Sequence, residues 1–308
     1  MSEPIKIRMG GYGPPTTGFS KSLKFIGDRL EKQFGSDVAI EYVFNIMDHG
    51  HKAEDILTLV ENGEITLGYQ SSSYLTDRVP ELGFVDLPFL FSSNAQARGA
   101  MDGALGEFLV RKTEERINYR ILGWFENGFR HISNRLRPIY LPADMKDMKI
   151  RVLPSEIHRR TFELLGAKAM RMDLTEAIAM IKAGTLDAQE NPLANTVTYG
   201  VHKFHRFHTL SYHFYISRPI FLHRTSFEAW PDEVRRAMQM AVTEAVAYQR
   251  KLALEEHESS RKAIEDEGCE INELTPKEHD AFVVAVQPLL ADARKNYGQA
   301  MFGMVPKA

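Results

Sequence analysis

The chain has 308 residues, 44% of them hydrophobic, which suffices for one large core or two ordinary ones, and its length favours two lobes. Its formal net charge of -3, with Lys and Arg scattered along the sequence, provides no positive field for phosphate backbones, so we expect no nucleic-acid partner. No apolar run approaches the roughly 20 residues of a membrane span.

The first predicted unit is a strand, a loop and a helix in the stretch IKIRMGGYGPPTTGFSKSLKFIGDRL, which begins at Ile5. Pro14 and Pro15 remove amide donors that a phosphate-binding loop requires, so the sequence argues against nucleotide binding. A second helix ends near Gly63 and leads through a short strand to a polar loop near Gln70. The buried face of the first helix has apolar residues at three-to-four spacing, namely Phe19, Leu23, Ile26 and Leu30.

A second unit, MKIRVLPSEIHRRTFELLGA, repeats the order strand, loop, helix. Asp173 and Glu176 have N-cap and N3 spacing, so they predict the start of a helix that Gly184 ends. The alternation of strands and helices predicts an α/β fold with mostly parallel sheets, and two similar units predict two lobes with a cleft between them. The expected buried face of this unit's first helix comprises Ile157, Thr161, Leu164 and Leu165.

One long helix, about residues 232–268, follows from a stretch without internal Pro or Gly, and we expect it to brace both lobes. We assign residues 1–125 and 212–250 to the first lobe. Residues 126–211 and 251–308 form the expected second lobe.

Arg151 ends the strand of the second unit. In open parallel sheets, ligands bind beyond the carboxyl ends of the strands. A guanidinium offers a planar fork that pairs with a carboxylate through two hydrogen bonds. Arg151 therefore indicates an organic acid as ligand. The alternative is an ion pair between Arg151 and a neighbouring Asp or Glu, and the spacing leaves both possibilities open.

Four motifs occur together along the chain: DLPFLF, GWFENGFRHISN, LPADMKDMKIRV and AGTLDAQENP. With them, from about Ile5 to the long helix, the chain resembles the solute-binding proteins of tripartite ATP-independent periplasmic (TRAP) transporters, the DctP-type family. The resemblance implies a two-lobed fold like that of periplasmic binding proteins. It also implies a salt bridge from Arg151 to the ligand carboxylate, a second donor from Arg130 and a polar contact from Asn191.

First-lobe contacts are expected from the loop at Gly10 to Tyr12 and from Gln70, and we include Leu174 in the expected site. Asp147 replaces the glycine that is usual in this family before the Lys-Ile-Arg segment, and Asp tolerates many glycine turns. The loop GYGPPTTGF also departs from the family pattern, which leaves the identity of the ligand open.

An aromatic pocket wall is one expectation for this site. Tyr12, His213 and Phe214 would suit an aromatic, branched or keto carboxylate. The alternative is that these rings are core, because alternation along a strand turns half of them inward.

We expect no metal and no cofactor. His202, His205 and His208 share a helical spacing, but no Cys or HExxH pattern accompanies them. We interpret them as a solvated basic face. The lone cysteine, Cys269, lies among acidic residues that disfavour a thiolate, so no nucleophile is indicated.

The resemblance implies a monomeric periplasmic receptor whose signal peptide is absent from this sequence. It would bind a small organic anion, close by hinge motion and deliver the anion to the TRAP membrane subunits. The alternative hypothesis is a cytosolic two-lobed enzyme acting on a small carboxylic acid, with His213 or Glu190 as acid or base.

Overall fold

The computed structural model describes residues 3–307, and the chain divides into two compact units. Unit 1 contains the chain up to Ser71, together with Val110–Glu126 and Ser217–Leu254. Unit 2 contains Ser72–Leu109, Asn127–Ile216 and the chain from Glu255 onward. Strands and helices alternate in both units, which confirms the predicted α/β class.

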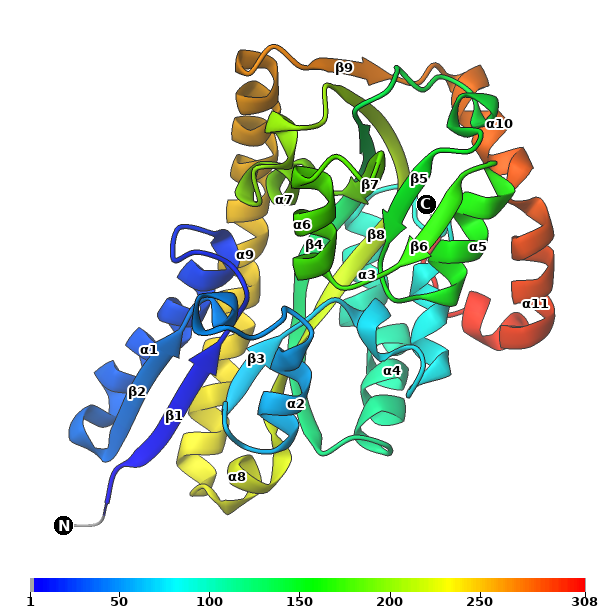
Figure 1. Ribbon diagram of the computed structural model, residues 1–308. Helices are drawn as coiled ribbons and strands as arrows, with labels where there is room; N and C mark the ends of the chain where they lie inside the picture. Colours follow the sequence, from blue (N-terminus) through cyan, green and yellow to red (C-terminus); the bar gives the residue numbers. More distant parts are fainter. Residues whose placement is uncertain (1–2, 308) are drawn as a thin grey trace. The chain divides into compact units, whose positions relative to one another are not determined.

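Unit 1 is built on parallel strands (Figure 1). Strand β1 (Ile5–Gly10) pairs with β2 (Val38–Val43) on one side and with β3 (Leu67–Tyr69) on the other. The last part of β8 (Phe207–His223) pairs antiparallel with β3 and places Ile220 opposite Tyr69. The helices that lie wholly in this unit are α1 (Gly18–Phe34), α2 (Asp55–Glu61) and α8 (Arg224–Ala229).

Helix α1 has the buried face that the sequence predicts, since Phe19, Leu23, Ile26 and Leu30 are all buried. Thr17 caps its N-terminus: its side chain accepts a hydrogen bond from the backbone N–H of Ser20 and so satisfies one of the free amides of the first turn.

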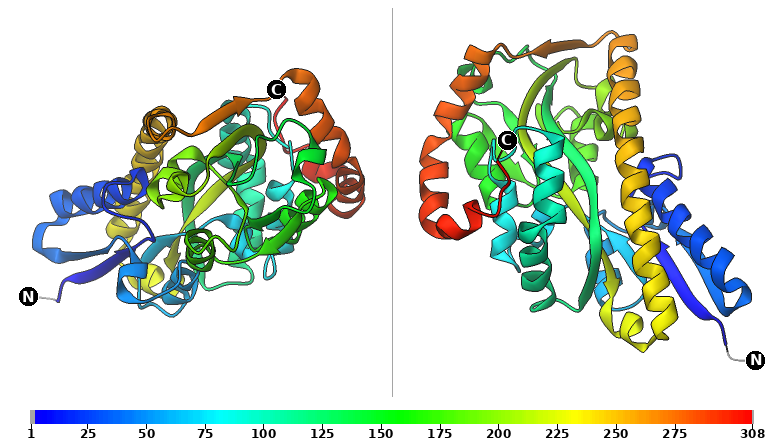
Figure 2. Two further views of the ribbon diagram at one scale, coloured as in Figure 1. Left: turned by 45° about the horizontal axis from the view of Figure 1, so that its top comes forward. Right: turned by 180° about the vertical axis from the view of Figure 1, so that it is seen from behind.

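The sheet of unit 2 has β5 (Lys149–Val152) at its centre, parallel to both β6 (Lys168–Arg171) and β7 (Ala188–Asn191). The end of β4 (Tyr119–Asn134) pairs antiparallel with β7. The start of β8 pairs parallel with β9 (Glu270–Glu273). The helices of this unit are α3 (Asn94–Asp102), α5 (Glu156–Leu164), α6 (Leu174–Lys182), α7 (Leu193–Thr198), α10 (Pro276–Ala285) and α11 (Gln287–Phe302), and the last of these contacts α5 and α10 (Figure 2).

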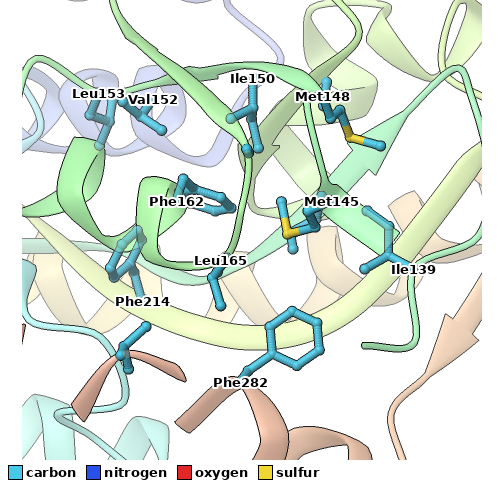
Figure 3. Close-up of a cluster of buried hydrophobic side chains, with 14 of the residues drawn as sticks. Ile139, Met145, Met148, Ile150, Val152, Leu153, Phe162, Leu165, Phe214 and Phe282 are labelled. Carbon is cyan, nitrogen blue, oxygen red and sulfur yellow. The ribbon is translucent and has the colours of Figure 1, made fainter. Parts of the chain in front are cut away.

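The core of unit 2 lies between β5, α5, β8 and α10 (Figure 3). Phe162 of α5, Phe214 of β8 and Phe282 of α10 are fully buried there. The expected buried face of α5 was wrong in part, because Leu164 is 38% exposed while His158 and Phe162 are buried. An apolar pattern misses His158, whose ring stacks on a core aromatic ring.

Helix termini in unit 2 follow the sequence signals. The carboxylate of Asp173 accepts from the backbone N–H of Thr175 and caps α6. Gly184 has φ 68°, a left-handed conformation that ends the helix at low cost for glycine. Asp147 also has a positive φ, 60°, as expected for a residue in a glycine turn.

Four elements contain residues of both units: α4 (Ala104–Glu114), β4, β8 and α9 (Asp232–Asp266). Helix α9 matches the long helix predicted from the sequence and runs for 35 residues. Short 3₁₀ helices occupy several connections: Gly35–Asp37, Ile46–His49, Ser72–Leu75, Pro80–Asp86, Pro142–Met145 and Val201–Lys203.

Candidate functional site

Arg151 lies in the central strand of unit 2, with Met170 of β6 and Gln189 of β7 beside it in the two ladders. It is only 1% exposed. Its Nε donates to the carbonyl of Met172 at 3.1 Å and its Nη2 to the hydroxyl of Tyr74 at 3.1 Å. Within residues 3–307 no Asp or Glu forms an ion pair with Arg151. The structure therefore gives no support to the alternative of a neighbouring acid as its partner.

Tyr74 connects Arg151 to the start of α6, and the sequence analysis missed it. Its hydroxyl accepts from Arg151 and from the backbone N–H of Leu174 at 3.2 Å, and it donates to the carboxylate of Asp173 at 3.4 Å. Two expected site residues, Arg151 and Leu174, thus meet at one hydroxyl. A tyrosine in the run SSSYLT carries no spacing signal for this role.

Arg130 of β4 has an internal partner in Glu190 of β7. Its Nε and Nη2 donate to the two carboxylate oxygens, and Nη2 also donates to the Glu190 carbonyl at 2.6 Å. Both side chains are buried. Burial alone would raise the pKa of Glu190, but the charge of Arg130 and the nearby imidazole of His213 outweigh burial and hold this pKa well below its usual value. Glu190 therefore stays ionised and balances the charge of Arg130.

His213 and Phe214 lie inside unit 2. His213 Nε2 is 3.5 Å from Glu190 Oε2, and its Nδ1 is 2.7 Å from the hydroxyl of Ser211. Burial lowers the pKa of His213 more than Glu190 raises it, so the imidazole is neutral. Phe214 stacks on His158 with ring centroids 3.9 Å apart and belongs to the hydrophobic core. Phe214 thus follows the core alternative left open by the sequence.

Asn191 ends β7 and is buried. Its amide donates to the side chain of Gln189 at 3.2 Å, and its side-chain oxygen accepts from Asn195 at 3.1 Å. Gln189 is the residue beside Arg151 in the β5–β7 ladder. The expected residues Arg151, Asn191 and Arg130 therefore lie on the neighbouring strands β5, β7 and β4.

The two expected residues of unit 1 lie just beyond the carboxyl ends of β1 and β3. Gln70 follows β3, and its amide donates to the carbonyl of Ala53 at 2.8 Å. Tyr12 follows β1 and packs against Tyr69, with ring centroids 5.4 Å apart. Beside them is Arg218 of β8, whose guanidinium carbon lies 5.1 Å from the Tyr12 ring centroid. Sequence reasoning missed Arg218, although a cation inside the apolar strand YISRPIF was a usable signal.

The three histidines of VHKFHRFH do not form the solvated face that we expected. His202, His205 and His208 are all buried. His205 contacts the hydroxyl of Ser133 at 2.9 Å, and His208 contacts the carbonyl of His205 at 2.9 Å. Within residues 3–307 there is no group of three or more His, Cys, Asp or Glu side chains placed to hold a metal ion.

In the same described part of the chain, no helix combines the length and the apolar character needed to cross a membrane. Residues 9–296 match the model of the DctP family, described as bacterial extracellular solute-binding protein, family 7. The chain belongs to this family.

Relatives of the DctP family extend the match over almost the whole chain. The 2,3-diketo-L-gulonate-binding periplasmic protein YiaO of Escherichia coli is 28% identical over 75% of this chain and 69% of its own length. The crystal structure of the sugar acid binding protein DctPAm from Advenella mimigardefordensis, in complex with galactonate, is 24% identical, with TM-score 0.93 over 99% of this chain and 98% of that one. A TRAP solute-binding protein from Sulfurospirillum deleyianum with bound succinate is 25% identical, with TM-score 0.91 over 99% of both chains.

Membership of the DctP family confirms the resemblance to TRAP solute-binding proteins. These are periplasmic transport receptors that work with membrane transporter subunits. The alternative hypothesis of an enzyme was wrong, because the family is one of transport receptors.

Proposed function

We propose that this chain is the solute receptor of a TRAP transporter and binds a small organic acid through a salt bridge between the ligand carboxylate and Arg151. Arg151 carries the proposal, because it is a buried guanidinium without an acidic partner within residues 3–307. A buried charge is costly unless it is paired. A ligand carboxylate supplies the missing partner.

Arg130 contrasts with Arg151. Arg130 is neutralised by Glu190, so in this proposal it contributes to the ligand as a donor and not as an uncompensated charge. Leu174 belongs to the proposed site because its backbone N–H and Arg151 donate to the same hydroxyl, that of Tyr74. Asn191 belongs to it because its side chain donates to Gln189, which lies beside Arg151 in the β5–β7 ladder. Tyr12 and Gln70 are the proposed contacts from unit 1.

Ligands of the relatives support an organic acid as the substrate class. The bound molecules of the solved structures are galactonate and succinate, and the Escherichia coli relative is named for 2,3-diketo-L-gulonate. All three are small carboxylates. We further propose that the chain acts as a periplasmic monomer, closes on its ligand by hinge motion and delivers it to the membrane subunits, since a closed state that gains ligand contacts is populated by binding.

A thermal-shift screen with aliphatic, keto, sugar-derived and aromatic carboxylates tests this proposal, because a ligand that binds only the folded state raises the melting temperature. For a hit, the Arg151→Ala variant loses a charge-assisted contact of about 2 to 5 kcal/mol. Calorimetry should therefore show an affinity roughly 30-fold to several thousandfold lower.

Arg159→Ala is the matched control for this experiment. Arg159 is a partly exposed arginine of α5 in the same unit and pairs with Glu156 and Glu163. Its removal should leave the affinity unchanged. An Arg151→Ala variant that binds the acid as tightly as the natural sequence would remove the proposed salt bridge.

A further inference from the structure

His158 of α5 lies between two buried carboxylates inside unit 2. Its Nε2 is 3.6 Å from Asp86 Oδ1, and its Nδ1 is 3.9 Å from Glu190 Oε1. All three side chains have 0% exposure. Within residues 3–307 neither ring nitrogen forms a hydrogen bond. Each nitrogen of this ring therefore has a carboxylate oxygen as its ion-pair contact.

This arrangement suits an imidazole ring that carries a proton on both nitrogens. A neutral ring has one N–H and one acceptor nitrogen, so one of its lone pairs would face a carboxylate. A doubly protonated ring presents a donor to each carboxylate instead. The ring of His158 also stacks on that of Phe214, which is labelled in Figure 3, with centroids 3.9 Å apart. The face of an aromatic ring attracts a cation, so this contact favours the charged ring as well.

Asp86 has the contacts of an ionised carboxylate. The hydroxyl of Ser73 donates to its Oδ1 at 2.6 Å, a length typical of a hydrogen bond to a charged oxygen. Its Oδ2 is buried and has no hydrogen-bond partner in the described part of the chain. A proton on Oδ2 would be a buried donor without an acceptor, which is rare in proteins. We therefore treat Asp86 as a negative charge.

The sum of the buried charges leads to the same state of His158. Asp86 and Glu190 contribute two negative charges, and Arg130 contributes one positive charge. The neighbouring imidazole of His213 is neutral, because burial lowers its pKa. A neutral His158 would leave an excess negative charge in the interior, which is costly. A doubly protonated His158 makes the group neutral.

Glu190 connects His158 to Arg130. Glu190 Oε1 accepts from Arg130 Nη2 at 2.9 Å and also faces His158 Nδ1. Its Oε2 accepts from Arg130 Nε and lies 3.5 Å from His213 Nε2. The remaining nitrogen of the guanidinium, Nη1, forms no hydrogen bond to residues 3–307. The plane in which Nη1 is presented thus depends on how firmly the Glu190 carboxylate is held.

We propose that His158 is doubly protonated at neutral pH and is a positioning residue, which holds Glu190 and through it the guanidinium of Arg130. This inference rests on the proposed function, in which Arg130 donates to the ligand. His158 acts through Glu190 and not on the ligand itself.

Nitrogen-15 NMR of the ligand-free full chain tests the charge of His158. In a doubly protonated ring the two nitrogens have similar chemical shifts, whereas in a neutral ring the unprotonated nitrogen is shifted far from the protonated one. The signals of His158 are those that disappear in His158→Gln, and His158→Asn provides a second variant for this assignment. We expect two similar shifts at neutral pH. Two widely separated shifts would overturn the inference.

Melting temperatures test the charge balance by a second route. Asp86→Asn leaves an excess positive charge and His158→Gln an excess negative one, so each variant should melt below the natural sequence. The double variant is neutral again and should melt above either single variant. A double variant that melts below both, as for two independent losses, would show that the two side chains do not balance each other.

Calorimetry with galactonate, succinate and 2,3-diketo-L-gulonate tests the positioning role. For an acid that binds, His158→Gln should lower the affinity roughly threefold to thirtyfold, the range for residues that act through a network. His208→Gln is the matched control, because His208 is a buried histidine of the same unit that contacts the carbonyl of His205. Its affinity should equal that of the natural sequence. An unchanged affinity in His158→Gln, together with a lower melting temperature, would make His158 a purely structural residue.

These outcomes distinguish the inference from the proposed function. Acid binding that is lost in Arg151→Ala but unchanged in His158→Gln keeps the proposed function and refutes the positioning role. If the natural sequence binds no acid, the proposed function and the positioning role are both refuted. The nitrogen-15 spectrum decides the charge of His158 in either case.

Discussion

Tyr74 controls the orientation of Arg151 without carrying charge itself. Its single hydroxyl accepts hydrogen bonds from Arg151 Nη2 and from the backbone N–H of Leu174 while it donates to Asp173. Arg151 has only one other hydrogen bond from its guanidinium to the described chain, to the carbonyl of Met172. The hydroxyl thus fixes the plane of the guanidinium, which matters because bidentate binding of a carboxylate depends on that plane.

The Tyr74→Phe variant should therefore bind the organic acid less tightly although no charge is lost. The expected loss is about 1 to 3 kcal/mol, the usual effect of removing one partner from buried polar groups, and calorimetry would measure it. Tyr297→Phe is the control, since it also removes a tyrosine hydroxyl, but one that donates its hydrogen bond to the carbonyl of Pro80 and not to a residue of the proposed site. Equal affinities in the two variants would show that Tyr74 does not position Arg151.

At the residue scale, the sequence predicted the place of Arg151 near the end of a strand, because that place depends only on a local pattern, a strand followed by a turn. The contacts of Tyr74 and Arg218 could not be found in this way. Tyr74 reaches Arg151 across 77 residues of chain, and Arg218 meets Tyr12 only because β8 returns beside β3. Whether an arginine has an acidic partner can be decided only when the residues around it in the fold are known. For the same reason the sequence did not reveal that Glu190 neutralises Arg130.

At the scale of the element, the segment that leads into β8 shows how burial changes the pKa of histidine side chains. His205 lies just before this strand and His208 is its second residue. Burial lowers the pKa of His205 to about 3 and that of His208 to about 4. The histidine pattern alone predicted an exposed basic face. Burial within unit 2 makes these side chains neutral hydrogen-bonding groups instead.

Stability should fall as the pH drops below about 6.5, the usual histidine pKa in an unfolded chain. The folded pKa values are depressed, so between pH 6.5 and about 4 the unfolded chain binds protons that the folded protein does not. Each neutral histidine then costs up to about 1.4 kcal/mol of unfolding free energy per pH unit. Urea unfolding at pH 7.5, 6 and 5 measures this slope.

The His205→Asn variant should have a shallower slope than the natural sequence, because one of the groups that gain a proton on unfolding is removed. His49→Asn serves as the control, since His49 is an exposed residue. If both variants keep the slope of the natural sequence, the acid sensitivity has another origin.

At the scale of the whole molecule, the sequence predicted the features that depend on regular local patterns. The α/β class follows from the alternation of strand and helix patterns, and the long helix follows from 35 residues without Pro or Gly. The partition into units depends on contacts that are distant in sequence. Unit 1 alone is assembled from three separate segments, and no local pattern marks the points within β4, β8 or α9 where the chain leaves one unit for the other.

Helix α9 should couple the unfolding of the two units, because its residues up to Leu254 belong to unit 1 and those from Glu255 to unit 2. Leu254 is 51% exposed, so Leu254→Ala removes little packing, whereas Leu254→Pro breaks the helix at a cost of about 3 kcal/mol or more. In differential scanning calorimetry the alanine variant should melt in one transition near that of the natural sequence. The proline variant should melt at least about 5 °C lower and separate into two transitions. A proline variant that still melts in one unshifted transition would mean that β4 and β8 suffice to couple the units.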